Sequence, residues 1–198
     1  MMRIVPFSAG AIVAIAVFGS ERAAAADPTG TWLTEDGRAR VRTEHCGPRD
    51  AQLCGYVVWA RKSDDGKAKP RLDEENPDVG KRKRPVLGHQ MILGLVPNAE
   101  RQYEGRIYNA DNGKSYDVTI WSETPAALSV RGCMFSYLCQ TQIWKRVTDM
   151  APGQLIGPTD GPGGPRADRE WSYATPAMTS STISPKIPPR APSSPPAR

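Results

Sequence analysis

Short segments with alternating polar and apolar residues, separated by turn signals, recur through residues 27–148. In the clearest of them, residues 38–45, Ala39, Val41 and Thr43 share one face and arginines occupy most of the other. Asn112-Gly113 and the sequence EDG at residues 35–37 are typical of hairpin turns. Because no segment has the period of an amphipathic helix, the chain is predicted to be all-β, with about eight short strands.

The order of these segments favours one kind of β fold. Successive hairpins without a long crossover are typical of a single small antiparallel up-and-down barrel, which removes exposed strand edges by closing on itself. Residues 52–60 are apolar on both faces and are predicted to form a central strand, and Gly94 is predicted to mark a bulge. A barrel of this size holds either packed side chains or one small ligand.

The two ends of the chain differ from this middle part. Residues 1–26 have the pattern of a secretory signal peptide: Arg3, an apolar run over residues 4–18, and small residues before Asp27. The run is shorter than the roughly 20 residues of a spanning helix, so we expect no transmembrane segment in the mature chain. We therefore expect an exported protein, located in the periplasm or secreted.

Residues 149–198 are rich in proline, glycine and serine, and their apolar residues have no period. Such a composition buries too little apolar surface to offset the entropy of ordering, so this tail is predicted to be disordered. Residues 27–148 then form the β-barrel domain, which is enough chain for a single core.

All four cysteines lie in the predicted domain: Cys46, Cys54, Cys133 and Cys139. An even number of cysteines in an exported chain favours disulfides, and of the three possible sets of pairs we expect the local one, Cys46–Cys54 and Cys133–Cys139. The alternatives are a zinc site and a redox pair, but neither has the C-x-x-C spacing that is typical of them. We expect no metal and no cofactor.

A long charged segment interrupts the strands at residues 61–88. Loops of this length are usually functional or mobile. The basic run Lys81-Arg82-Lys83-Arg84 suits an anionic lipid surface or phosphates, and the alternative is a solvated loop whose charges pair with one another. Its acidic residues resemble a calcium-binding loop but lack the known spacing.

Five sequence motifs recur together in one known family: GTWLTEDGRARV, LCGYVVW, DEENPDVGKRKRPVLG, YEGRIYNADNGKSYDVTI and QTQIWKRV. By these motifs the chain resembles a family of uncharacterised exported bacterial proteins, the domain of unknown function numbered 2147. This sequence has Ala110-Asp111-Asn112 where relatives usually carry Pro-Glu-Asp, and the tail lies outside the resemblance. The resemblance implies a lipocalin-like barrel and no particular activity.

The pair Gly30-x-Trp32 is also similar to the start of lipocalins. In lipocalins the tryptophan closes the base of the barrel and an arginine from a late strand packs on it as a cation–π contact. In this sequence the arginine is expected to be Arg131 or Arg146.

Catalytic motifs are not found. The predicted domain has only two histidines, His45 and His89, and neither a G-x-S-x-G elbow nor a glycine-rich phosphate loop. Pairs of loop carboxylates for glycoside hydrolysis remain open, although shaping turns is the simpler role of these acids. We therefore expect a protein that is not an enzyme.

Two functions remain. The first is binding of a small hydrophobic or amphipathic ligand by the barrel. The alternative is a module that uses the charged loop at residues 62–87 to bind another envelope protein or an anionic lipid surface; nucleic acid is not expected of an exported chain. The candidate ligand or partner residues are Trp32, Asp36, Asp73, Asn76, Asp78, Arg84, Tyr108, Asn109 and Arg131.

Overall fold

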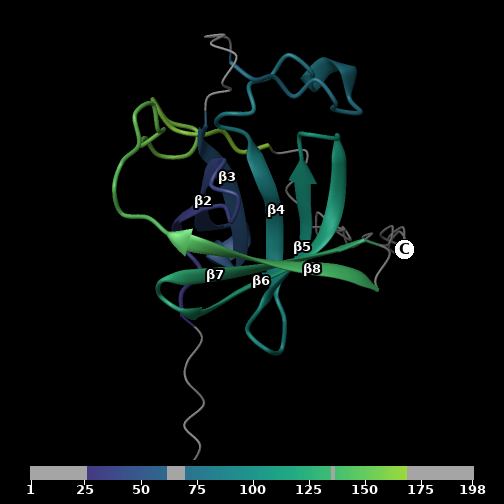
Figure 1. Ribbon diagram of the computed structural model, residues 1–198, viewed down its shortest axis with the longest axis vertical. Coiled ribbons are helices and arrows are strands. Elements are labelled where there is room, and N and C mark those ends of the chain that lie inside the picture. Colours follow the sequence, from purple (N-terminus) through teal and green to yellow (C-terminus); the bar gives the residue numbers. More distant parts are fainter. Residues whose placement is uncertain (1–25, 62–69, 135–136, 169–198) are drawn as a thin grey trace, which may run out of the picture.

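A computed structural model describes residues 26–61, 70–134 and 137–168, and within them the strands form a closed antiparallel barrel in sequential order (Figure 1). Each strand pairs with the next, and the first closes against the last. This confirms the predicted all-β, up-and-down architecture. The strands are β1 (Gly30–Leu33), β2 (Ala39–Cys46), β3 (Gln52–Ala60), β4 (Gln90–Pro97), β5 (Tyr103–Asn109), β6 (Lys114–Thr124), β7 (Ala127–Met134) and β8 (Leu138–Arg146).

The barrel has two different ends. The base carries the turns at residues 47–51, 98–102 and 125–126, and the 3-10 turn η1 (Pro48–Asp50) lies in the first of them. The other end, which we call the mouth, carries the turns at 34–38 and 110–113 and the long connection between β3 and β4. That connection contains the 3-10 turn η2 (Val79–Lys81) and covers the mouth, at the top of Figure 1.

Apolar side chains from each described strand fill the inside of the barrel. Period-two alternation sends every second residue of each strand inward, and the inward residues here are mostly branched or aromatic. Tyr103 and Ile107 of β5 are partly buried and pack against the cluster, directly opposite Ile120 and Ile92. The buried members are Trp32, Val41, Leu53, Ile92, Leu95, Val118, Ile120, Leu128, Val130 and Trp144.

Trp32 and Arg146 close the barrel where β1 meets β8. The Arg146 guanidinium lies 4.1 Å from the centre of the fully buried Trp32 ring, and its Nη1 donates to the Thr29 carbonyl at 2.8 Å. The Trp32 indole N–H donates to Thr43 Oγ1 at 2.8 Å. A Cβ atom at Gly30 would lie 2.1 Å from Arg146 Nη1, so the guanidinium occupies space that only glycine leaves free. Arg146 is therefore the expected cation–π partner, and Arg131 is not.

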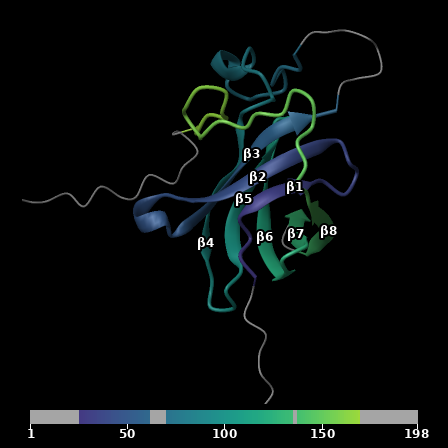
Figure 2. The same ribbon diagram turned by 90° about the vertical axis from the view of Figure 1, so that its left-hand side faces the viewer.

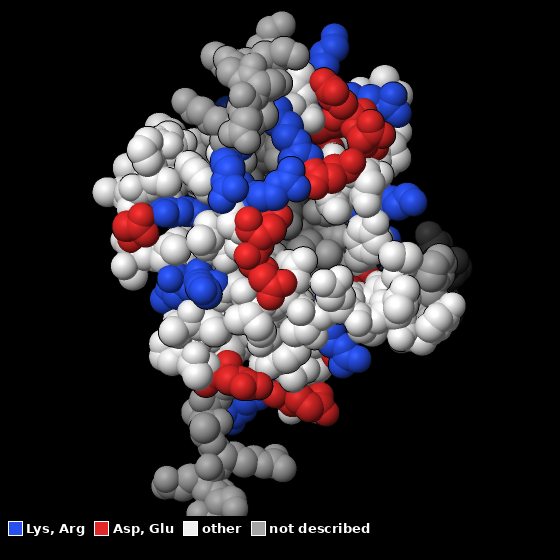
Figure 3. Space-filling model, in the orientation of Figure 1, with Lys and Arg blue, Asp and Glu red and all other residues white. Residues whose placement is uncertain are grey.

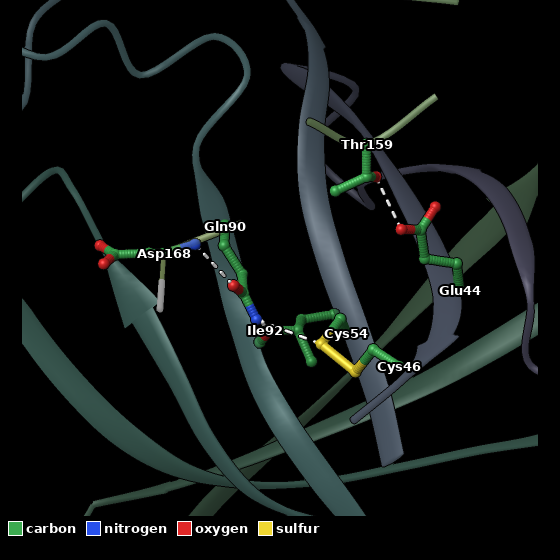
Figure 4. Close-up of a disulfide and its surroundings, with 7 residues drawn as sticks. All are labelled: Glu44, Cys46, Cys54, Gln90, Ile92, Thr159 and Asp168. Atoms are coloured by element: carbon green, nitrogen blue, oxygen red, sulfur yellow. Dashed lines mark hydrogen bonds between the residues drawn. A yellow bond between two sulfur atoms is a disulfide. The ribbon is translucent and has the colours of Figure 1, made fainter. Parts of the chain in front are cut away.

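Both predicted disulfides are present. Cys46–Cys54 joins the end of β2 to β3 around η1, and Cys133–Cys139 joins residues directly opposite each other on β7 and β8. Cys54 of the first disulfide is buried, and Gln90 Nε2 donates to its Sγ at 3.2 Å (Figure 4).

Residues 149–168, which we call the strap, cover the outer face of β2 and β3 (Figure 2). Leu155 and Ala167 pack on Cys54, Tyr56 and Val58, which are therefore buried on the outside of the barrel. The strap is held by its backbone as well, since the Leu155 N–H donates to the Val58 carbonyl at 2.8 Å.

The arginines of β2 bind the strap rather than solvent. Arg40 bonds the Asp149 carboxylate at 2.9 Å, and Arg42 Nη1 donates to the Gly157 carbonyl at 2.8 Å. The prediction of a disordered tail from residue 149 is thus wrong for residues 149–168. The composition of these residues predicts disorder because it gives them no apolar face of their own. The strap is ordered instead by its contacts with β2 and β3. Residues 1–25 and 169–198, with the predicted signal peptide and the rest of the tail, lie outside the described residues.

Substituting Arg146 with lysine should destabilise the barrel by about 1–3 kcal/mol, because lysine keeps the charge but loses the planar cation–π stack and the carbonyl contacts. Urea unfolding followed by tryptophan fluorescence measures this. Arg131→Lys, on the exposed face of β7, is the control and should leave the unfolding midpoint unchanged. Equal effects of the two substitutions would contradict the role given to Arg146.

Removing the strap should cost more than removing the residues that follow it. A chain ending at Asp168 is expected to unfold at the same urea concentration as the full chain. A chain ending at Thr148 should lose roughly 3–6 kcal/mol, because Tyr56 and Val58 become exposed. Equal stability of the two truncated chains would show that the strap contributes nothing to the fold.

Candidate functional site

A cluster of polar and charged side chains lies under the β3–β4 connection at the mouth. Its residues come from that connection, from β5 and from the end of the strap, which are far apart in sequence. Asp73 and Asn76 are fully buried, which is unusual for polar residues unless they are hydrogen-bonded. We call this set the mouth cluster: Asp73, Asn76, Arg84, His89, Tyr108 and Asp168.

The Asp73 carboxylate is the centre of the cluster and accepts three hydrogen bonds from side chains. The Tyr108 hydroxyl donates to Oδ1 at 2.6 Å, and Asn76 Nδ2 and Arg84 Nε each donate to Oδ2 at 2.8 Å. Burial by itself raises the pKa of Asp73, but these hydrogen bonds and the Arg84 charge outweigh it and hold the pKa below the usual value. Asp73 is therefore a charged group at neutral pH.

Arg84 bridges two carboxylates. Besides Asp73, its guanidinium bonds Asp168 at the end of the strap, and Lys81 Nζ lies 3.7 Å from the same carboxylate. The Arg84 guanidinium also lies 5.7 Å from the centre of the Tyr108 ring. Burial and the Asp73 carboxylate raise the pKa of Tyr108 to about 12, so its hydroxyl stays a donor.

His89 packs edge-on against Tyr108, with 5.8 Å between the ring centres, and is only 6% exposed. Burial and the nearby Arg84 charge lower the pKa of His89 to about 4, so its imidazole is neutral at pH 7. His89 Nδ1 and Arg84 Nη2 are both buried and have no hydrogen-bond partner within the described part of the chain. The described residues contain two further atoms of this kind, Arg40 Nε and Arg42 Nε on β2.

Local turn chemistry holds the connection in place. The Asn76 side-chain carbonyl accepts from the Asp78 N–H at 2.9 Å, and Asp78 in turn caps η2 by accepting from the Gly80 N–H. The Asp73 N–H donates to the Arg84 carbonyl at 3.0 Å, which joins the two ends of this loop. Gly113 of the β5–β6 turn touches it, because a Cβ there would lie 1.8 Å from the Glu75 carbonyl.

The structure brings together four of the residues singled out in the sequence: Asp73, Asn76, Arg84 and Tyr108. The other five lie elsewhere. Trp32 closes the base, and Arg131 is exposed on β7. The remaining three shape turns: Asp36 bonds Thr34, Asp78 caps η2 and Asn109 accepts from the Asp111 N–H.

Sequence reasoning missed His89 and Asp168 as members of the cluster. His89 directly precedes β4, so its position next to a strand was a usable signal. Asp168 carries no such signal, because it lies in a stretch whose composition predicts disorder.

No group of three or more His, Cys, Asp or Glu side chains among the described residues is arranged to hold a metal ion. The same residues contain no helix with the length and apolar character to span a membrane.

Two open hollows mark the described surface. One, of about 340 Å³, lies over β5 to β7 and includes Gly105 and Thr119, and the other, of about 270 Å³, lies beside the mouth and includes Arg71 and Glu75.

Neutral His89 should make stability depend on pH. An unfolded chain binds a proton at this histidine below about pH 6.5, whereas the folded chain does so only below about pH 4. The free energy of unfolding should therefore fall as pH falls from 6.5 to 4, by up to about 1.4 kcal/mol per pH unit, and this contribution should level off below pH 4.

Urea unfolding at a series of pH values tests this with two matched variants. His89→Gln should lack the decline between pH 6.5 and 4, while His45→Gln, at a solvent-accessible position of β2, should keep it. If both variants follow the wild type, His89 is not the group that titrates.

The barrel can be compared with known proteins at this point. No curated protein matches the chain. Among solved structures, the chain is similar to protein HP1028 from the human pathogen Helicobacter pylori, described as belonging to the lipocalin family, with a TM-score of 0.51 and 23% sequence identity. The match covers 62% of this chain and 84% of that one. At this identity the likeness shows the fold alone, a lipocalin-like barrel.

The sequence comparison covers the whole barrel. Residues 30–146, from the first residue of β1 to the last of β8, match one family model. The mouth-cluster residues that lie inside this range are Asp73, Asn76, Arg84, His89 and Tyr108, whereas Asp168 lies outside it. The chain belongs to the family described as an uncharacterized protein conserved in bacteria, DUF2147.

Proposed function

We propose that the protein is an exported, non-enzymatic binding protein of the cell envelope. Its ligand is a small amphipathic molecule whose oxygen-rich head lies at the mouth cluster. The observation that carries this proposal is a pair of buried nitrogens, Arg84 Nη2 and His89 Nδ1, that have no hydrogen-bond partner among the described residues. A carboxylate, phosphate or carbonyl group accepts from the arginine nitrogen, and neutral imidazole nitrogen is able to donate or accept.

The surroundings of these nitrogens suit an amphipathic molecule. Val57 of β3 and Val86 of the β3–β4 connection are buried apolar residues close in sequence to this end of the barrel. Small-molecule sites typically combine an apolar lining with a few polar groups that fix orientation. Because side chains already fill the barrel towards its base, the proposed ligand is small and sits near the mouth rather than deep inside.

Export is supported by the cysteines and by the predicted signal peptide. All four cysteines are paired in two disulfides, and disulfides persist mainly in oxidising compartments such as the bacterial periplasm. The lipocalin-like fold is consistent with the same location.

The alternative function, docking of the basic run on an anionic surface or another envelope protein, is less well supported. Lys81 and Arg84 bind Asp168, and Arg82 Nε donates to the Asn76 carbonyl at 2.8 Å. Three of the four basic side chains therefore already have partners within the chain. On the face drawn in Figure 3, basic groups at the mouth end lie directly beside acidic ones.

Native mass spectrometry and calorimetry test the proposal on the full chain, expressed with its leader and recovered from the periplasm. A co-purifying small molecule is expected in the native spectrum. Sodium dodecanoate, used as the probe, should bind the delipidated protein. Arg84→Lys keeps the charge but loses the second donor, and it should weaken dodecanoate binding at least tenfold.

Arg106→Lys, at an exposed position of β5, is the matched control and should bind as the wild type does. Absence of both a co-purified molecule and dodecanoate binding would overturn the proposal. Retention of the wild-type protein on anionic lipid vesicles in that case would favour the docking alternative.

A further inference from the structure

Among the residues that the structure describes, β8 has a partner strand along its whole length on one side and almost none on the other. On one side it pairs with β7 from Leu138 to Lys145. On the other side β1 is only four residues long and meets β8 at two positions, Trp32 with Arg146 and Leu33 with Lys145. The first part of β8, residues 138–144, is thus an open strand edge at the front of Figure 1.

The direction of the backbone groups follows from the register. The Arg146 N–H donates to Ala126 next to β7, while the Val147 N–H donates to Thr31 next to β1. Backbone groups alternate in direction along an antiparallel strand, so the odd-numbered residues of β8 point away from β7. The Ile143 N–H agrees, because it donates to the side chain of Glu35 at 3.2 Å. The N–H and C=O of Thr141 have no partner within the described residues.

This edge lacks the features that usually protect a strand from pairing. Natural edges carry charges, prolines or bulges that block a second strand. Residues 138–144 read LCQTQIW, with no charge and no proline, and residues 140–143 are exposed on both faces. Apolar side chains flank the edge: Tyr137 is 84% exposed, Leu138 61% and Ile143 43%. The Cys133–Cys139 disulfide fastens the end of the β7–β8 ribbon.

We propose that this edge pairs with the same edge of a second copy of the chain, in antiparallel orientation about a two-fold axis at Thr141. Only registers that place odd residues opposite odd residues let the outward groups bond each other. With the axis at Thr141, the two Thr141 residues exchange N–H···O bonds, Cys139 faces Ile143 and Gln140 faces Gln142. Thr–Thr pairs stabilise antiparallel strands, and this register places no like charges opposite each other.

A second copy suits this edge better than an unrelated strand, because the edge is self-complementary. Thr141 pairs with Thr141 of the second copy, and the side-chain amides of Gln140 and Gln142 lie opposite each other. Ile143 covers the disulfide at Cys139 of the second copy. Pairing replaces the contact between Ile143 and Glu35 by a backbone hydrogen bond. A strand-edge interface is small, so the dimer is reversible and forms as the protein concentration rises from about 10 μM to 1 mM.

Sedimentation velocity of the full chain tests the proposal. Thr141→Pro removes the outward N–H without touching a hydrogen bond to β7, and it should leave a monomer at 1 mM. Thr141→Lys places two positive charges across the axis and should raise the dissociation constant at least tenfold. Thr124→Lys, at an exposed position of β6, is the control and should dimerise as the wild type does.

Hydrogen exchange of the wild type provides a second measurement that does not depend on a variant folding. Protection of residues 138–143 should increase with protein concentration. A wild-type monomer at 1 mM would overturn the proposal, and so would protection that is independent of concentration, which would indicate that the chain's own residues cover the edge. Dimerisation that survives both Thr141 substitutions in a folded protein would also overturn it.

Discussion

Closure of the barrel between β1 and β8 is the constraint on which the rest of the structure depends. β1 offers only four residues, so the backbone joins the two strands at just two positions. Arg146 supplies the missing contact by stacking on Trp32 and bonding the chain before β1. A cation–π contact in a desolvated place contributes roughly as much as one or two backbone hydrogen bonds. The same short β1 leaves the first half of β8 without a neighbour, so closure and the open edge have one cause.

The mouth is closed by a different kind of interaction. Removing charges from water is costly unless each is paired and hydrogen-bonded, and Asp73 meets this condition with three side-chain donors. Arg84 and His89 do not meet it fully, since each has one buried nitrogen for which the described part of the chain supplies no partner. These two nitrogens are the atoms at which the proposed ligand would bind. The strap takes part as well, because Asp168 holds Arg84 from the outside.

Much of the fold could be predicted from the sequence because local patterns specify it. Three predicted features depend only on neighbouring residues, and the structure confirms each of them: the strand at residues 38–45, the turn at Asn112-Gly113 and the two local cysteine pairs. Four members of the mouth cluster were also among the candidate residues. The strap was not foreseen, because its order comes from Arg40, Arg42 and the outer face of β3, more than a hundred residues away. The apolar character of β3 on both faces was the one sign that something covers the barrel there.

The sequence by itself determined the strand order, the sulfur pairing and the residue types available at the mouth, since each follows from periodicity or short spacing. Only the tertiary structure decided which arginine stacks on Trp32, which acids shape turns and which one is buried, and that Asp168 meets Arg84. These outcomes depend on where distant segments meet once the sheet has curled and closed. The geometry of closure is a property of all the strands together, so no single stretch of the chain encodes it.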